Sequence, residues 1–147
     1  MQIMKIYIGA DHRGFEMKNK LIEFLIEKNY SVEDCGAYEL DITDDYPEIT
    51  ASVVEKMEGD DLGIVLCGSG IGVDIAANRF NGIRSGLGFD EHQVKKGRED
   101  DAINVLALAA DEITLETAQK LVEVFITTKP LTKDRYVRRQ EELDELT

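Results

Sequence analysis

The sequence predicts an α/β fold, in which a five-stranded parallel sheet carries helices on both faces. Three observations favour this class: apolar residues switch repeatedly between short β-rich runs and helical spacing, the two kinds of segment alternate, and 147 residues suit one core. Strands that alternate with helices are joined by right-handed crossovers, which make the sheet parallel. We therefore expect residues 1–147 to form one Rossmann-like three-layer domain without linkers or internal repeats.

The first two expected strands flank an amphipathic helix. The β-rich run IMKIYIGAD (3–11) predicts a strand that ends at Gly9, and YSVEDCG (30–36) predicts the second strand. The stretch between them (14–30) has charged residues on one helical face and apolar residues on the other. The apolar residues at helical spacing are Phe15, Leu21, Ile22, Leu25 and Ile26.

The middle of the chain repeats the alternation. A helix is expected over 46–60, where Pro47 suits the first turn because proline has no N–H to leave unpaired. A strand (61–68), a helix (72–82) and another strand (83–89) follow.

The last third contributes the remaining elements. A weaker helix is expected over 90–100, a strand over 103–110 and a helix over 114–128. Thr114 is suited to cap the latter, because its hydroxyl can accept a backbone N–H. The charged amphipathic stretch that follows predicts a C-terminal helix at about 131–146.

Composition and charge limit the partners of this chain. Thirty acidic residues against seventeen basic ones give a net charge of -13, which disfavours nucleic-acid binding because that needs a basic face. Any anion site must gather its few arginines locally. No apolar run reaches the ~20 residues of a membrane helix, and the N-terminal run lacks the layout of a signal peptide. With only two cysteines, a reducing, cytoplasmic location is expected.

Three chemically loaded stretches fall at the ends of predicted strands. They are GADHRG (9–14), CGSGIG (67–72) and GFDEH (88–92). In a parallel sheet, ligands bind outside the carboxyl ends of the strands, near the point where the strand order reverses. The sequence therefore predicts a ligand site at this edge of the sheet.

The stretch CGSGIG combines a thiol with a glycine turn that leads into a helix. Its glycines do not match a dinucleotide fingerprint, and no Gly-Lys-Ser/Thr follows as in a nucleotide phosphate loop. Unpaired N–H groups and the helix dipole can nevertheless bind an anion there. Such surroundings favour a thiolate, so that Cys67 could act as a nucleophile or general base. Alternatively, Cys67 is a small buried apolar residue at the end of a strand, as we expect for Cys35.

Asp11 and His12 follow the first predicted strand. An aspartate there can hold a sugar hydroxyl, and a histidine can bind phosphate or transfer protons. Asp11 can also cap the next helix, and the two roles are compatible. The other histidine, His92, is expected at the surface.

Three arginines, Arg135, Arg138 and Arg139, stand out in the acidic C-terminal stretch. A guanidinium fits phosphate oxygens, and Arg135 and Arg139 share one helical face. Alternatively, the arginines only pair with acidic residues of the same helix. No cysteine–histidine spacing resembles a zinc site, and DITDD lacks the pattern of a calcium loop, so no metal is expected.

A set of short motifs, spread in order along nearly the whole chain, resembles the ribose-5-phosphate isomerase B family. These motifs are GADHRGF, DYPE, CGSGIGVDIAANR, GIRSGL, NVLALAA and the tail arginines. That family includes the galactose-6-phosphate isomerase subunits. The resemblance implies an aldose–ketose isomerase of carbohydrate metabolism, in the pentose phosphate pathway, that acts on a sugar phosphate through a cis-enediolate. It further implies an enzyme without a cofactor and a homodimer or tetramer, in which residues of a partner subunit complete each site.

The resemblance implies a role for each matching residue. Cys67 would be the base that moves a proton between C1 and C2. Ser69 and backbone N–H groups of the glycine loop would hold the developing negative charge. These groups belong to Gly68, Gly70, Ile71 and Gly72; Asp11 and Asn78 would bind sugar oxygens, Tyr46 would line the sugar site, and His12, Arg135 and Arg139 would bind the phosphate.

The sequence departs from the family at one functional position. Where the family usually has a His-Asn pair, this chain has Asp100 and Asp101, which we expect at the site as an acid and a substrate-binding residue. The family's histidine helps to open the sugar ring, whereas an ordinary aspartate is already ionised at pH 7. Tyr136 also stands where the family often has histidine.

Three interpretations of this departure stay open. Asp100 could substitute as the acid in a ribose 5-phosphate isomerase, which is the favoured hypothesis. The substrate could instead be a hexose phosphate or an unphosphorylated sugar. The chain could also be a weakly active subunit that only binds sugar phosphates.

Two further classes compete with the isomerase. A nucleotide-binding α/β protein is disfavoured by the missing fingerprint. A cysteine hydrolase would need a histidine beside Cys67, and His12 is the candidate.

Overall fold

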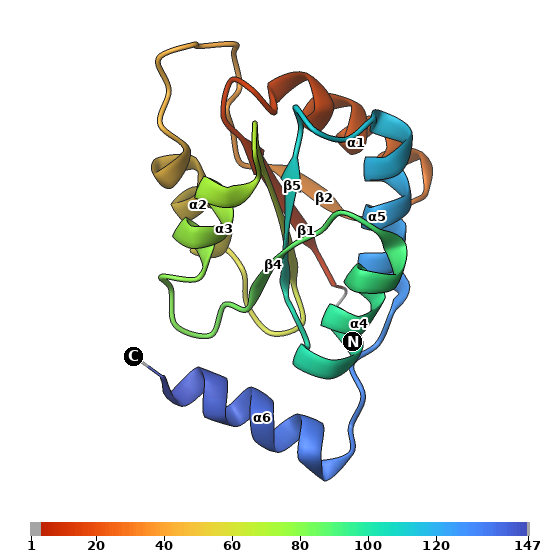
Figure 1. The fold of residues 1–147 in the computed structure, drawn as a ribbon. Helices are drawn as coiled ribbons and strands as arrows, with labels where there is room; N and C mark the ends of the chain where they lie inside the picture. Colours follow the sequence, from red (N-terminus) through yellow and green to blue (C-terminus); the bar gives the residue numbers. More distant parts are fainter. Residues whose placement is uncertain (1–3, 147) are drawn as a thin grey trace.

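One parallel sheet organises the protein in the computed structural model, which describes residues 4–146 (Figure 1). The strands stand in the order β2-β1-β3-β5-β4, and every neighbouring pair is parallel. The predicted sheet is thereby confirmed, while residues 1–3 and 147 of the predicted domain, including Ile3 of the first predicted strand, lie outside the described part. The strands are β1 (Ile6–Ala10), β2 (Val32–Asp34), β3 (Leu62–Cys67), β4 (Ser85–Leu87) and β5 (Val105–Ala109).

Helices cover both faces of the sheet, as predicted, and the C-terminal helix lies apart from them (Figure 1). On one face lie α1 (Phe15–Glu27), α4 (Glu91–Asp101) and α5 (Leu115–Thr127); on the other lie α2 (Tyr46–Val54) and α3 (Ile71–Ala77). The last helix, α6 (Asp134–Glu145), crosses beyond the amino ends of the strands. Within the described residues, the helices are too short or too polar to cross a lipid bilayer.

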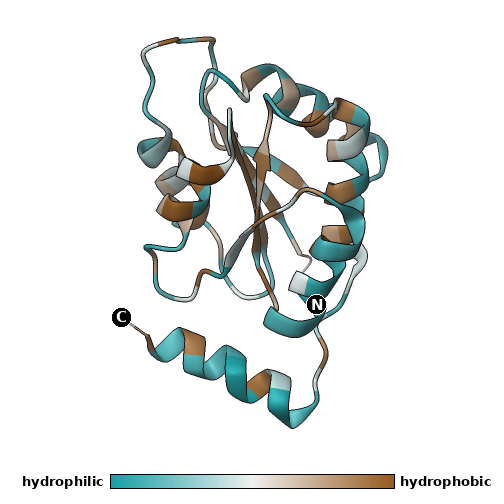
Figure 2. Ribbon diagram, viewed as in Figure 1, coloured by the Kyte–Doolittle hydropathy of each residue, from teal (hydrophilic) through white to brown (hydrophobic). Residues whose placement is uncertain are grey.

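Alternate side chains of the strands build two separate cores. Leu66 packs toward α1 and α5 with Phe125, and both are fully buried. Val65 and Cys67 pack on the opposite side with Val73 of α3. The long central strands are buried along their whole length, as a sheet covered on both faces requires (Figure 2). This pattern directs the Cys67 side chain toward α2 and α3.

Local signals in the sequence explain several helix boundaries. Pro47 stands in the first turn of α2, and the Thr114 hydroxyl accepts a backbone N–H at the start of α5 at 3.1 Å, both as predicted. The helix predicted over 46–60 is shorter in the structure and ends at Val54. The chain then turns through Gly59, whose φ of +57° lies in the left-handed region that glycine tolerates best.

Candidate functional site

The candidate site lies where the direction of strand addition reverses. From β1 the chain first adds β2 on one side and then β3 on the other, so β1 and β3 are neighbours with adjacent carboxyl ends. A cleft of about 620 Å³ opens at this edge. It is lined by Asp11, Arg13, Tyr46, Cys67, Gly68, Ser69, Ile71, Gly72, Ile75, Asp111 and Glu112. The structure thus brings together the first two of the three predicted strand-end stretches.

Cys67 is the last residue of β3, and it is both buried and part of the cleft lining. Only 5% of the residue is exposed, and it packs beside Val73 of the core. The two interpretations of Cys67 are therefore compatible, since a core cysteine can reach the cleft from the strand end. Cys35 is also a free buried thiol, and burial is the main cause that raises its pKa. That setting fits the structural role expected for Cys35.

The glycine loop after Cys67 is held by close packing. Gly70 has φ +73°, a conformation that residues with a side chain rarely adopt. A Cβ there would also lie 2.5 Å from a methyl carbon of Leu87, so backbone conformation and packing both require glycine. The Ser69 hydroxyl accepts the N–H of Ile71 at 3.2 Å. This bond fixes the serine at the start of α3, where its hydroxyl and the loop N–H groups border the cleft.

Tyr46 forms the wall opposite the glycine loop. It begins α2, and its ring lies so close to α3 that a Cβ on Gly72 would come within 2.7 Å of it. A glycine at position 72 therefore leaves room for the end of the Tyr46 ring against the first turn of α3. The placement agrees with the predicted part of Tyr46 in lining the site.

Asp11 and His12 are fixed in the turn between β1 and α1. The buried Asp11 carboxylate accepts the N–H groups of Arg13 at 3.0 Å and Gly14 at 3.3 Å. These bonds hold the turn before α1, whereas the N-cap of the helix itself is Gly14, so the predicted capping role of Asp11 is replaced by a turn-stabilising one. Asp44 holds His12 twice, because one oxygen accepts the backbone N–H at 3.0 Å and lies 2.8 Å from Nδ1. Asp44 engages only Nδ1 of the imidazole. His12 is not among the described residues that line the cleft with Cys67, which disfavours a hydrolase that needs a Cys67–His12 pair.

The same three residues are close enough to be considered as metal ligands. Ligand atoms of Asp11, His12 and Asp44 all lie within 4.8 Å of one another. Their mutual hydrogen bonds and backbone contacts account for this proximity without an ion. One oxygen of Asp44 is buried without a hydrogen-bond partner in the described structure. Sequence reasoning missed Asp44, which lies on an irregular loop far along the chain.

Two charged cleft residues, Arg13 and Asp111, were also missed. Arg13 donates from Nε to the Asp111 carboxylate at 2.6 Å, and a second guanidinium nitrogen contacts the same oxygen. Asp111 follows β5 closely, so the rule that predicted the other stretches at strand ends could have found it.

Asn78 is not among the described residues that line this cleft and borders a separate cavity beside α4 and β4 instead. Its amide accepts the N–H of Ser85 at 2.8 Å and donates to the carbonyl of Ser85 at 3.0 Å. The Ser85 hydroxyl also donates to Asp74 at 2.6 Å. Asn78 therefore joins the end of α3 to the start of β4, and its polar atoms are committed to the fold.

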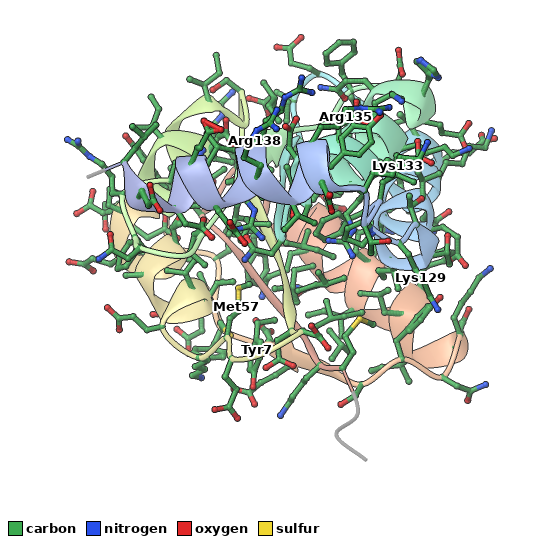
Figure 3. All side chains as sticks on the ribbon, turned by 90° about the horizontal axis from the view of Figure 1, so that it is seen from below. Tyr7, Met57, Lys129, Lys133, Arg135 and Arg138 are labelled. Carbon is green, nitrogen blue, oxygen red and sulfur yellow. The ribbon has the colours of Figure 1, made fainter. Side chains whose placement is uncertain are left out.

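The remaining predicted residues lie at the opposite edge of the sheet. Asp100 and Asp101 end α4, just before β5 begins, and Asp100 lies 3.4 Å from the ammonium of Lys96. They border a second cavity of about 690 Å³ between α4, β4 and α6. Figure 3 looks onto this end of the molecule, where α6 carries Arg135 and Arg138 across the underside. Within one chain these groups cannot meet Cys67.

The α6 helix makes few contacts with the rest of the chain. None of its residues is buried, and all of them are described. Arg84 binds Asp144 at 2.8 Å and 3.0 Å, and Gln140 donates to the Asp100 carbonyl at 3.3 Å.

Only one of the three tail arginines pairs with an acidic residue of its own helix in the described structure. Arg138 lies 3.7 Å from Glu142, as the ion-pair alternative expects. Arg135 instead stacks on the ring of Tyr136 and donates to its hydroxyl at 3.0 Å. Arg139 is exposed on the same helix. Arg135 and Arg139 thus present guanidinium groups at the end of the molecule away from the cleft.

Comparison with known proteins gives consistent results. A model of the ribose/galactose isomerase family matches residues 6–143. The ribose-5-phosphate isomerase B of Mycobacterium leprae is 36% identical over 141 residues, which are 95% of this chain and 87% of that protein. That of Escherichia coli is 34% identical over 124 residues, covering 83% of each chain.

Solved structures agree with this match. The ribose 5-phosphate isomerase B of Anaplasma phagocytophilum superposes with a TM-score of 0.92 at 33% identity, covering 97% of this chain and 98% of the other. The enzyme of Mycoplasma genitalium with bound ribulose-5-phosphate gives 0.91 at 32% identity, covering 97% and 96%.

Proposed function

The chain belongs to the ribose/galactose isomerase family, and from that premise we propose that it interconverts ribose 5-phosphate and ribulose 5-phosphate. The observation that carries the proposal is the cleft at the strand switch point, where Cys67 and the Ser69 loop lie together. A family relative of 32% identity was solved with ribulose-5-phosphate bound. These relatives support the pentose phosphate as substrate over a different sugar.

The reaction needs one base and a site for a negative charge. In the open-chain aldose, the Cys67 thiolate takes the proton from C2, and the electrons move onto O1 to give a cis-enediolate. The Ser69 hydroxyl and the loop N–H groups stabilise the oxyanion. A proton passes from O2 to O1, and the thiol returns its proton to C1, which makes C2 the carbonyl of the ketose and restores the thiolate. No oxidant or cofactor enters this balance.

The other residues of the cleft bind the substrate. Asp11 accepts a hydrogen bond from a sugar hydroxyl with the carboxylate oxygen that the turn leaves available. Tyr46 lines the sugar chain. His12, held at Nδ1 by Asp44, directs Nε2 toward the phosphate.

A second copy of the chain completes the site in this proposal. Three of the four charged residues that line the cleft are acidic, which is a poor setting for a phosphate dianion. Arg135 and Arg139 lie at the far end of their own chain, on a helix without buried residues. In a symmetric pair, α6 of one copy can lie over the cleft of the other, so that Asp100, Asp101, Arg135 and Arg139 of the partner join it.

The chemistry is tested by NMR in D2O with purified protein and ribose 5-phosphate. Deuterium at C1 of the ribulose 5-phosphate formed, or at C2 of the ribose 5-phosphate, is expected from the enediolate. Allose 6-phosphate, galactose 6-phosphate and free pentoses serve as competing substrates. Exchange with only one of these, or with no sugar at all, would overturn the proposed function.

The shared site is tested by mixing two variants that each have little activity when the ribose 5-phosphate concentration is far below KM. Cys67→Ser damages one edge and Arg139→Ala the other, so each pure variant has two damaged sites. After unfolding and refolding together, half of the dimers are mixed and hold one intact site, which restores about a quarter of the wild-type activity. The matched control mixes Cys67→Ser with Cys67→Ala. Equal activity in both mixtures would show that each chain acts alone.

The role of Asp100 is tested with a sugar phosphate that has no ring. Erythrose 4-phosphate cannot form a furanose because its O4 carries the phosphate, whereas ribose 5-phosphate must be opened. If Asp100 opens the ring, Asp100→Asn loses turnover on ribose 5-phosphate but retains proton exchange on the tetrose. An equal loss on both substrates would assign Asp100 to the proton transfer or to binding.

A further inference from the structure

The ion pair of Arg13 and Asp111 lies directly across the glycine loop. A Cβ built on Gly68 would lie 2.5 Å from Arg13 Nε and 2.5 Å from a carboxylate oxygen of Asp111. Gly68 separates Cys67 from Ser69, so the pair covers the peptide between the base and the hydroxyl that holds the oxyanion. The N–H of Asp111 also donates to the Gly68 carbonyl at 3.0 Å, which ties the loop after β5 to this peptide.

Arg13 supplies the one positive charge among the described residues that line the cleft. The other ionisable groups facing Cys67 are Asp11, Tyr46, Asp111 and Glu112. The hydrogen bond to Asp111 is the main cause that raises the pKa of Arg13, and a smaller contribution comes from the negative charge of a Cys67 thiolate. Arg13 and Cys67 line the same cleft, and the Arg13 side chain lies against Gly68, the residue that follows Cys67.

Exposure alone would suggest that the pair is an ordinary surface contact. The Arg13 and Asp111 side chains are 57% and 37% exposed, and exposed pairs of this kind contribute little to stability. The position argues for a different role, because the pair occupies the space above Gly68 instead of an open surface. A guanidinium held beside a thiol stabilises the thiolate, whatever the pair contributes to folding.

We propose that Arg13 is a further residue of the site, whose guanidinium stabilises the Cys67 thiolate and the enediolate charge, and that Asp111 positions it. The enediolate part rests on the proposed function, whereas the thiolate part does not. Asp111 binds one edge of the guanidinium, so the remaining N–H groups stay available for an anion.

The experiment measures the reactivity of Cys67 without any sugar. In a Cys35→Ser background, the rate of alkylation by iodoacetamide, a neutral reagent, is followed from pH 5 to 10. Arg13→Gln should move the half-maximal pH upward by about one unit and slow alkylation at pH 7 about tenfold. Arg13→Lys keeps the charge and should recover most of the rate. Arg79→Gln, an exposed arginine of the neighbouring α3 region, is the matched control and should change nothing.

The variant Asp111→Asn distinguishes the effect of the Arg13 charge from the effect of the Arg13–Asp111 ion pair. Both Asp111→Asn and Arg13→Gln break the same ion pair, so a merely structural pair would give the two variants the same profile. The proposal expects them to diverge: Asp111→Asn leaves the half-maximal pH unchanged or lower, while kcat falls several-fold because the guanidinium is no longer positioned. Identical shifts, or no shift in Arg13→Gln, would refute it. A chain that isomerises no sugar but shows the divergent profiles would refute only the proposed function.

Discussion

The two edges of the sheet hold the predicted site residues in different ways. At the carboxyl edge, Asp11, Cys67 and Ser69 are placed by buried strands and by hydrogen bonds within the loops. At the amino edge, Arg135 and Arg139 project from α6, none of whose residues is buried. Topology thus determines the first group within one chain. The second group lies at the other end of the same chain, on a helix that few contacts hold in place.

The largest effect is expected from the carboxyl edge. Cys67→Ser replaces the proposed base with a hydroxyl that is not ionised at neutral pH, so kcat should fall about 10³-fold. The melting temperature should change little, because serine fills nearly the same volume at the end of the strand. Steady-state kinetics and thermal unfolding measure both quantities. Retention of a tenth of the activity would mean that another group is the base.

An intermediate effect is expected from the amino edge. Arg139→Ala removes a charged hydrogen bond to phosphate, so KM for ribose 5-phosphate should rise roughly 10- to 100-fold. Arg138→Ala is the matched control, because Arg138 is on the same helix but pairs with Glu142. The comparison would fail if the two variants raised KM alike, since that would indicate a general charge effect of α6.

A smaller effect is expected where a loop supports the carboxyl edge. Asp44→Ala frees His12 from the contact at Nδ1 and should raise KM about tenfold or less with little change in kcat. Asp45→Ala is the control, because that neighbour begins α2 without a side-chain cap. If kcat fell instead of KM rising, His12 would belong to the proton transfer.

The smallest effect concerns stability beneath the glycine loop. Burial is the main cause that raises the pKa of Asp74, although the hydrogen bond from Ser85 opposes it. A raised pKa gives stability that is complete below the unfolded value of ~3.9 and is lost as pH rises through the folded value. Asp74→Asn should therefore raise the melting temperature at pH 7, relative to pH 4, by roughly 1–3 °C.

The control for this measurement is Asp60→Asn, at an exposed loop position. Its melting temperature should differ from that of the wild type by the same amount at both pH values. An Asp74→Asn variant that gained nothing at pH 7 would show that the Ser85 hydrogen bond outweighs the burial.

The fold and the carboxyl-edge residues were predictable from local patterns. Buried strand runs, the glycine turn after Cys67 and Pro47 at a helix start are short-range signals, and topology then brings Asp11 beside Cys67. Arg13 and Asp111 each follow a strand end, so their positions were open to the same reasoning, but their pairing was not predictable because the contact spans 98 residues of sequence. Their types are also common on any acidic surface.

Two other cases show where pattern reasoning stops. Asn78 was assigned to the substrate through resemblance. In the structure its amide forms two hydrogen bonds with the backbone of Ser85, which no sequence motif predicts. Asp100 was placed at the site by the same resemblance, and the structure puts it at the far edge of its own chain. A resemblance can assign a residue to a site, but it does not say whether the residues of that site meet within one chain.

The short outer strands of the sheet have a consequence for aggregation. The central runs IYIGA, LGIVLC and VLALA are apolar enough to add to foreign strands if they were exposed. They are flanked by β2 and β4, which have three residues each, and Glu33 on β2 is held by Lys5 and Lys56. A short, charged border offers little template for another chain. The two outer strands therefore limit the addition of further strands to the sheet, which is the step by which fibrils grow.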